Sequence, residues 1–221
     1  MAFDPLNQTK SDMQIFPRSL NRLAAIVAIA TVLAGGLVTG IVWYYFSPKN
    51  LWVGYRPHQP VPYSHWLHAG QLGIDCRYCH ANVERSPEAM IPPTQTCMNC
   101  HALVRTDSAR LALVRHSWQT GEAIPWVRID RLPNHAYFDH SAHVSVGVGC
   151  VECHGRVDQM DVVQQVQPLS MGFCLDCHRD PGPHLRPVDQ VTNMSWTSTS
   201  GPRERPPRQV IPPQNCSGCH R

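Results

Sequence analysis

Five copies of one short motif carry the chemistry of this sequence. Each copy has two cysteines separated by two residues and followed at once by a histidine, and the five copies use all ten cysteines. This spacing lets two thiols bond to the two vinyl groups of one haem while the histidine binds its iron. The sequence therefore predicts five covalently bound haem c groups. The predicted attachment residues are Cys76, Cys79, Cys97, Cys100, Cys150, Cys153, Cys174, Cys177, Cys216 and Cys219, and the predicted proximal ligands are His80, His101, His154, His178 and His220.

Two other kinds of site also use paired cysteines, namely zinc sites and disulfide frameworks. Neither kind requires a histidine after every pair, and only 13 of the 221 residues are histidine. Haem attachment therefore explains the pattern better. It also leaves no cysteine over for a disulfide or a reactive thiol.

Two pairs of histidines stand in equivalent places before the first and the third motif. The segments are Tyr63-Ser-His-Trp-Leu-His68 and Phe138-Asp-His-Ser-Ala-His143. Two histidines three residues apart on a helical turn project from the same side, so one pair can serve two neighbouring irons. The repeat predicts two dihaem modules, at about residues 63–101 and 138–178. The predicted distal ligands of four bis-histidine haems are His65, His68, His140 and His143.

The fifth motif, residues 216–220, has no histidine pair before it. His135, Met171, Met194 and His184 all lie within reach as its distal ligand. A methionine would give this haem a higher reduction potential than a second histidine. His58 and His116 are predicted not to bind iron.

The segment after Lys49 has few long apolar runs and is rich in proline and glycine. An ordinary hydrophobic core cannot be built from it, so packed haems are expected to fill the interior. The predicted fold is mainly α with much irregular loop, and it combines one N-terminal transmembrane helix with a haem-cored multihaem cytochrome c domain of repeated dihaem modules, similar to class III. We predict a short helix at residues 106–118 and a strap at 181–213.

A run of 24 uncharged residues, 23–46, is long enough to cross a bilayer as a helix. A cleaved signal peptide begins similarly, but this run is longer and ends in Trp43-Tyr-Tyr-Phe46, which suits a membrane interface. We predict a cytoplasmic segment 1–22, a single-pass anchor 23–46 in a bacterial plasma membrane, and a periplasmic haem domain 47–221. Covalent haem attachment on the outer membrane face sets this orientation. Gly36 and Gly40 form a small face on which another helix could pack.

The sequence resembles the pentahaem cytochrome c subunit of alternative complex III, a bacterial quinol:electron-acceptor oxidoreductase. The resemblance extends over nearly the whole chain and departs at Asn134, Ala136 and Phe173, none of them a predicted ligand. Its most specific parts are residues 63–70, 73–80, 91–93, 97–101, 125–128, 132–143 and 168–179.

The resemblance implies an electron-transfer subunit with no catalytic site of its own. The implied partners are an iron–sulfur subunit related to molybdopterin enzymes, multi-helix membrane subunits that oxidise menaquinol, a monohaem cytochrome c, and a periplasmic carrier or terminal oxidase as acceptor. Nucleic acid is not expected as a partner, because haem propionates offset the formal charge of +3.

Three other functions are alternatives to this one. Two are close to it: a cytochrome of another quinone-linked complex, and a free-standing quinol dehydrogenase cytochrome. The third is a haem enzyme such as a nitrite reductase, which needs an open coordination position on iron. All five motifs here end in histidine, and further histidines remain to serve as distal ligands, so catalysis at a haem is disfavoured.

Overall fold

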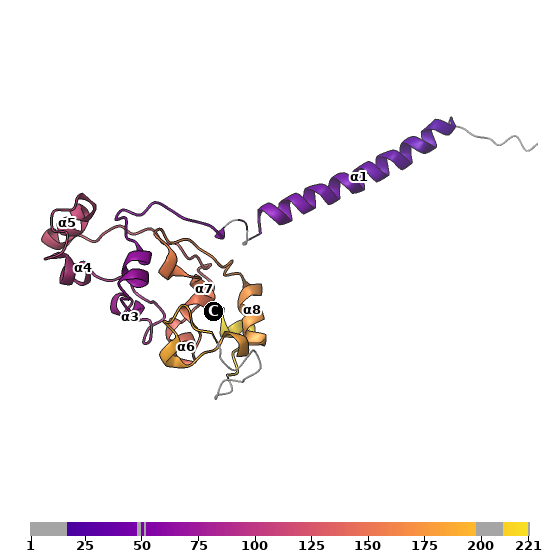
Figure 1. Ribbon diagram of the computed structural model, residues 1–221. Coiled ribbons are helices and arrows are strands. Elements are labelled where there is room, and N and C mark those ends of the chain that lie inside the picture. Colours follow the sequence, from indigo (N-terminus) through magenta and orange to yellow (C-terminus); the bar gives the residue numbers. More distant parts are fainter. Residues whose placement is uncertain (1–16, 48–49, 51, 198–209, 221) are drawn as a thin grey trace, which may run out of the picture. The chain divides into compact units, whose positions relative to one another are not determined.

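The computed structural model describes residues 17–47, 50, 52–197 and 210–220 (Figure 1). The chain divides into two compact units, Met1–Ser47 and Pro48–Arg221. The described residues form helices, turns and irregular loops, without a β-strand. The predicted mainly helical fold with much loop is confirmed.

The N-terminal unit contains one long helix, α1 (Arg18–Tyr45). Its segment Arg22–Tyr45 has a mean hydropathy of 2.4, and none of it is buried. In the described part of the chain this is the one helix long and apolar enough to cross a membrane. It begins five residues before the predicted span, because helical hydrogen bonds join backbone groups and can continue beyond an apolar run.

In the C-terminal unit, residues 48–221, each cysteine motif forms a short helix or helical turn. Polar caps start several of them: the Asp75 carboxylate accepts the Arg77 N–H, Ser170 Oγ accepts that of Phe173, and the Asn215 side chain accepts that of Gly218. One helical turn places both cysteines of a motif on the same side. The elements are α3 (Cys76–Cys79), α4 (Thr94–His101), α7 (Cys150–His154), α8 (Met171–Arg179) and the 3₁₀ turn η6 (Cys216–Gly218).

Both histidine pairs lie on helical turns, but the two turns differ. The second pair begins α6 (His140–Ser145), whereas the first lies at the start of a π-helix, η1 (Trp66–Gln71). In η1 the Leu72 N–H donates to the Leu67 carbonyl, one residue farther back than in an α-helix.

Between the modules, α5 (Ala112–Thr120) follows a 3₁₀ turn, η2 (Ala109–Leu111), and packs on α4. Gly121, with φ of 77°, ends α5 in the left-handed conformation that glycine adopts most easily. The predicted helix at 106–118 is therefore displaced by a few residues. Three further 3₁₀ turns are η3 (Val157–Gln159), η4 (Gly182–His184) and η5 (Val188–Gln190).

Residues 182–197 of the predicted strap are folded onto the second module. Leu185 forms an isolated bridge with Val148, and the Cys150 N–H donates to the Val191 carbonyl. The Arg186 N–H donates to the Gly147 carbonyl at 2.9 Å, and a Cβ on Gly147 would overlap the Arg186 carbonyl oxygen. Glycine is needed at this close approach.

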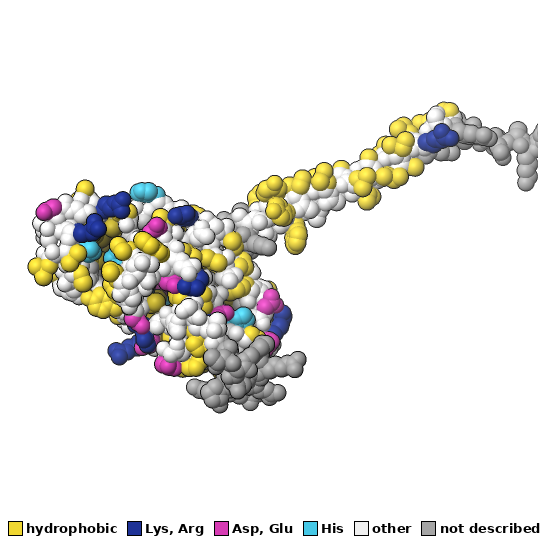
Figure 2. Space-filling model, in the orientation of Figure 1, with side chains coloured by type: hydrophobic (Ala, Val, Ile, Leu, Met, Phe, Trp, Pro, Cys, Tyr) yellow, Lys and Arg dark blue, Asp and Glu magenta, His cyan; other side chains and the backbone are white. Residues whose placement is uncertain are grey.

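The described residues have a very small hydrophobic core. The buried apolar side chains are Val61, Val114, Val144, Leu185 and Val191. Instead of a larger core, the C-terminal unit encloses a cavity of about 3150 Å³. That volume is several times the size of an ordinary ligand pocket of about 300–1,000 Å³. Hydrophobic side chains also lie on the visible surface of the C-terminal unit (Figure 2). The interior has room for several large apolar groups.

Candidate haem-binding sites

Predicted distal and proximal histidines face one another across this cavity. Four ring pairs among the described residues have centroids 5.4 to 6.4 Å apart. A histidine nitrogen binds a metal ion at about 2 Å and the ring centre lies roughly 1 Å farther back, so two rings on opposite sides of one iron have centroids about 6 Å apart. The pairs are His68 with His101 at 6.2 Å, His140 with His154 at 6.4 Å, His143 with His178 at 6.1 Å and His135 with His220 at 5.4 Å.

The pKa of His65 is lowered to about 4, first by burial and then by the charge of His80, the proximal histidine of the first motif. Burial also lowers the pKa of His80 and of His143. The neutral imidazole is the form that binds a metal ion, so burial keeps these rings ready for ligation.

One aromatic ring orients each histidine pair. Tyr63 meets His65 edge-on at 4.8 Å and stacks on His68 at 4.4 Å. Phe138 repeats this arrangement in the second module, edge-on to His140 at 4.7 Å and tilted against His143 at 4.5 Å. These aromatic residues were visible in the repeated sequence, but their positioning role was not predicted.

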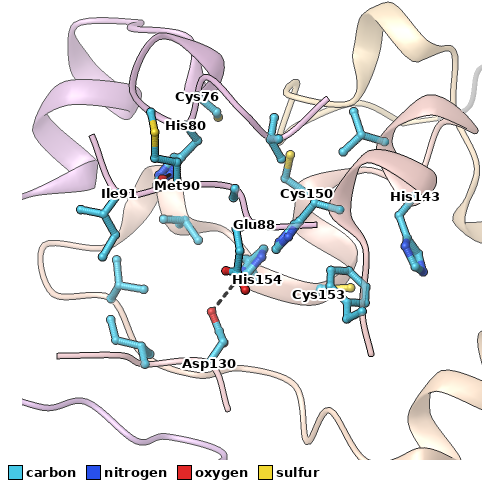
Figure 3. A pocket seen from close by; sticks show the side chains of 18 of the residues that line it. Cys76, His80, Glu88, Met90, Ile91, Asp130, His143, Cys150, Cys153 and His154 are labelled. Atoms are coloured by element: carbon cyan, nitrogen blue, oxygen red, sulfur yellow. Dashed lines mark hydrogen bonds and ion pairs between the residues drawn. The ribbon is translucent and has the colours of Figure 1, made fainter. Parts of the chain in front are cut away.

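Contacts at Nδ1 hold eight of these rings and leave Nε2 for a metal. In seven of them Nδ1 donates a hydrogen bond to a backbone carbonyl, and in His154 it forms an ion pair with the Asp130 carboxylate at 2.9 Å (Figure 3). Such outer partners commonly fix the orientation of metal-binding histidines. The carbonyl partners are Ser64 for His68, Met90 for His80, Val104 for His101, Pro87 for His140, Asp139 for His143, Pro213 for His178 and His135 for His220.

The two modules pack against each other reciprocally. The Pro87 carbonyl, from the first module, accepts hydrogen bonds from the backbone N–H and Nδ1 of His140. In the opposite direction, the Trp66 N–H donates to the Met160 carbonyl in the second module. A Cβ on Gly70 would overlap the Asp158 carbonyl, so glycine permits this contact between η1 and η3. Each module thus helps to place the histidines of the other.

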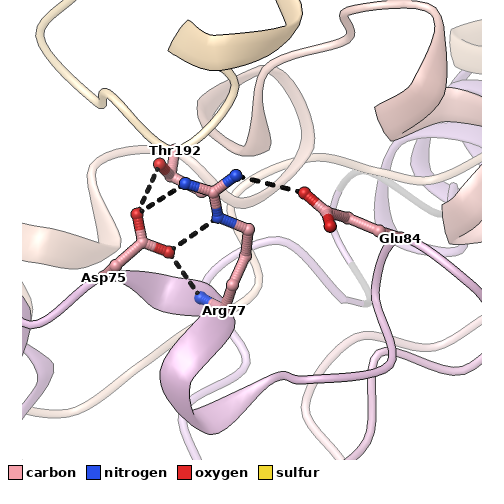
Figure 4. A network of polar contacts seen from close by, with 4 residues as sticks. All are labelled: Asp75, Arg77, Glu84 and Thr192. Atoms are coloured by element: carbon pink, nitrogen blue, oxygen red, sulfur yellow. Dashed lines mark hydrogen bonds and ion pairs between the residues drawn. The ribbon is translucent and has the colours of Figure 1, made fainter.

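A polar network joins the first motif to the strap (Figure 4). Arg77 bonds both oxygens of Asp75, at 2.9 and 3.0 Å, and also Glu84 at 3.1 Å. Thr192, on the strap, donates to the same Asp75 carboxylate at 3.0 Å. These bonds lower the pKa of Asp75 to about 2, mainly through the guanidinium of Arg77. The network fixes the start of α3.

The fifth motif is held by residues that lie far from it in the sequence. The Tyr137 N–H donates to the Cys219 carbonyl at 2.8 Å, and Ala136 forms an isolated bridge with His220. These contacts bring the rings of His135 and His220 to 5.4 Å. Of the candidates for the fifth distal ligand, we therefore propose His135 in preference to Met171, whose side chain is 68% exposed, and Met194.

Replacing His135 with alanine is expected to make one haem high-spin without loss of any haem, because the thioether bonds to Cys216 and Cys219 remain. Electron paramagnetic resonance of the oxidised protein would measure the change. Met171→Leu and Met194→Leu should leave all haems low-spin. A high-spin signal in either methionine variant, with none in His135→Ala, would refute this assignment.

The remaining histidines have other surroundings. His116 bonds the Glu122 carboxylate through Nε2, the nitrogen that the predicted ligands leave for iron. His184 bonds Glu152 through Nδ1 at 2.9 Å, and His58 is exposed. No ring contact between these three and a proximal histidine occurs in the described residues. The prediction that His58 and His116 are not ligands stands as a prediction.

The five motifs follow one another in space in an order that differs from the sequence. Asn99 in the second motif donates to the Tyr78 hydroxyl of the first motif at 3.0 Å. His140, which faces the third motif, bonds the Pro87 carbonyl of the first module, and His143 on the same helix faces the fourth motif. The fourth motif meets the segment just before the fifth, where His178 Nδ1 donates to the Pro213 carbonyl and the Gln214 side chain donates to the His178 carbonyl.

Two comparisons with known proteins relate part of the chain to cytochromes c. Residues 136–221 match the family model of cytochrome c7 and related cytochromes c. A multihaem cytochrome c subunit of menaquinone reductase from Nitratidesulfovibrio vulgaris is 30% identical over 122 residues. The alignment covers 54% of this chain and 56% of that relative, so the chain spans about half of the relative's length.

Residues 136–221 therefore resemble cytochromes c, and proteins of this kind carry covalent haem c. The residues present fit that group: the cavity replaces an apolar core, the cysteines lie on single helical turns, and facing histidines are spaced for a shared iron. The number of haems and the individual ligands remain predictions.

Proposed function

We propose that this chain is the electron-transferring cytochrome subunit of a membrane-bound quinol:electron-acceptor oxidoreductase of the alternative complex III type. Haem c, when bound, takes up and releases one electron at a time. The observation that carries the proposal is the chain of contacts that joins the five motifs in a row, from the second through the first, third and fourth to the fifth. Such a row suits transport of electrons across the domain.

The ligand set supports relay rather than catalysis at iron. We propose that the chain holds five haems, each between two histidines. The proposed pairs are His65 with His80, His68 with His101, His140 with His154, His143 with His178, and His135 with His220. Two histidines per iron leave no open position for a substrate.

We further propose that α1 is a single-pass anchor with its N-terminus in the cytoplasm and the haem domain in the periplasm. Its apolar segment and the exposed aromatic residues Trp43 and Tyr45 near its end support an interface position. No side chain lies within 4 Å of a Cβ placed on Gly36 or Gly40, so a partner helix could approach there. The proposed partners are an iron–sulfur subunit, quinol-binding membrane subunits and a monohaem cytochrome c.

The name of the menaquinone reductase relative favours a second candidate function. In that case the chain would carry electrons toward menaquinone instead of away from menaquinol. The two functions differ in direction. In purified complex, rapid haem reduction by a menaquinol analogue supports the first, and menaquinone-dependent haem oxidation supports the second.

Replacing both Gly36 and Gly40 with leucine is expected to weaken association with the membrane partners by about 1–3 kcal/mol, because larger side chains push packed helices apart. The variant should retain its haems and their spectra, yet migrate as a smaller haem-stained band in native electrophoresis and lose quinol-dependent haem reduction.

Ala34→Leu with Val38→Leu is the matched control, since 3.6 residues per turn place these positions on the opposite face of α1. If the glycine variant assembles and turns over as well as this control, docking does not depend on the glycine face.

A further inference from the structure

One of the five proximal histidines differs from the others in the partner of its Nδ1 atom. His80, His101, His178 and His220 donate through Nδ1 to backbone carbonyl oxygens. His154 Nδ1 instead forms an ion pair with a carboxylate oxygen, Asp130 Oδ2, at 2.9 Å. Figure 3 shows Asp130 reaching His154 from a separate segment of the chain. The third motif therefore has a negative charge where the other four have a neutral dipole.

The structure holds Asp130 in place from both sides. Its own carbonyl accepts a hydrogen bond from Arg128 Nε at 3.0 Å. On the other side, the Arg131 N–H donates to the fully buried Gln165 side chain at 3.2 Å, and the Arg131 guanidinium lies 4.8 Å from the Trp52 ring centre. The Asp130 side chain is 28% exposed. The flanking contacts thus hold the Asp130 carboxylate beside His154.

The proposed distal ligand on the other side of this haem has a neutral carbonyl as its partner. His140 lies parallel to His154 within 5° and donates through Nδ1 to the Pro87 carbonyl. Asp130 therefore acts on one side of the haem only. A carboxylate next to Nδ1 of a ligating histidine makes that histidine more basic. A more basic ligand stabilises ferric relative to ferrous iron, and outer partners of the axial ligands are a principal control of haem potential.

We propose that Asp130 is a positioning residue that lowers the reduction potential of the haem bound at Cys150, Cys153 and His154. The inference rests on the proposed function, because it takes His154 and His140 as the ligands of that haem. The third motif lies in the middle of the row, because His140 bonds Pro87 of the first module and shares α6 with His143, which faces His178 of the fourth motif. Asp130 thereby makes the central haem of the row harder to reduce.

The test is a potentiometric titration of the full-length holoprotein with Asp130→Asn. Asparagine keeps the size of the side chain but removes its charge. We expect the reduction potential of one haem to rise by about 59 mV. For a one-electron couple this corresponds to about a tenfold change in the oxidised-to-reduced ratio. The low-spin resonance signal of the same haem should change its g values. Asp130→Glu, which restores the carboxylate, should recover part of the shift.

Glu88→Gln is the matched control, because Glu88 lines the same cavity but bonds no proximal histidine among the described residues (Figure 3). It removes one negative charge without touching the ion pair at His154, so its effect on the potential should be clearly smaller. Equal shifts in the two variants, or no shift in Asp130→Asn, would overturn the role of Asp130. The proposed function fails on different grounds, namely fewer than five haems by mass or low-spin spectra that survive loss of His140.

Discussion

Replacing His140 with alanine is expected to turn one haem of the oxidised protein from low-spin to high-spin while every haem stays attached. The His140 ring faces that of His154 at 6.4 Å and is parallel to it within 5°. Its removal leaves one coordination position open, whereas the thioether bonds to Cys150 and Cys153 do not depend on it. Paramagnetic resonance measures the spin state, and the mass of the intact chain measures attachment.

His143→Ala should have the same effect at the fourth motif, where the ring faces His178 at 6.1 Å. His116→Ala is the control, because its Nε2 bonds Glu122 at the surface of α5. That variant should retain the wild-type spectrum. If both His140→Ala and His143→Ala kept all haems low-spin, the interpretation of the repeated pairs as distal ligands would be wrong.

Removing the haems is expected to unfold the C-terminal unit. Five buried apolar side chains among the described residues are far too few to offset the conformational entropy of ordering a domain of this length. The chain matured normally should have the mass of five attached haems and resist limited proteolysis. The same chain made in cells that cannot attach haem should be degraded rapidly, although α1 still enters the membrane.

A milder variant separates loss of one haem from loss of the core. Cys216→Ala with Cys219→Ala removes the predicted fifth site, which lies at one end of the row. We expect four haems by mass and a domain that still resists protease over most of its length. A haem-free chain as resistant as the mature protein would contradict the idea that haems form the core.

Local patterns in the sequence were sufficient for the features that depend on neighbouring residues. Thioether attachment requires two cysteines on one helical turn with a histidine beside them, and α3, α4, α7 and α8 provide such turns. The equivalence of the two histidine pairs was also visible, as was the apolar span that forms most of α1. The mainly helical fold and the expectation of a multihaem cytochrome c domain followed from these patterns.

Features that depend on long-range contacts were not visible in the sequence. Tyr63 and Phe138 orient the histidine pairs through ring contacts, and the Pro87 carbonyl reaches His140 from the other module. A short motif carries no information about which distant carbonyl or ring will meet it. Hydrophobic periodicity gave little help, because the interior is a cavity for cofactors and not a packed apolar core.

The sequence by itself determined which residues can attach haem, which histidines can serve as ligands and where a membrane helix can form, since each depends on spacing over a few residues. The tertiary structure alone decided which rings face each other, the spatial order of the motifs and the ion pair between Asp130 and His154. His135 meets His220 because backbone contacts at Ala136 and Tyr137 hold the two distant segments together. Such pairings between distant segments form only when the whole domain folds.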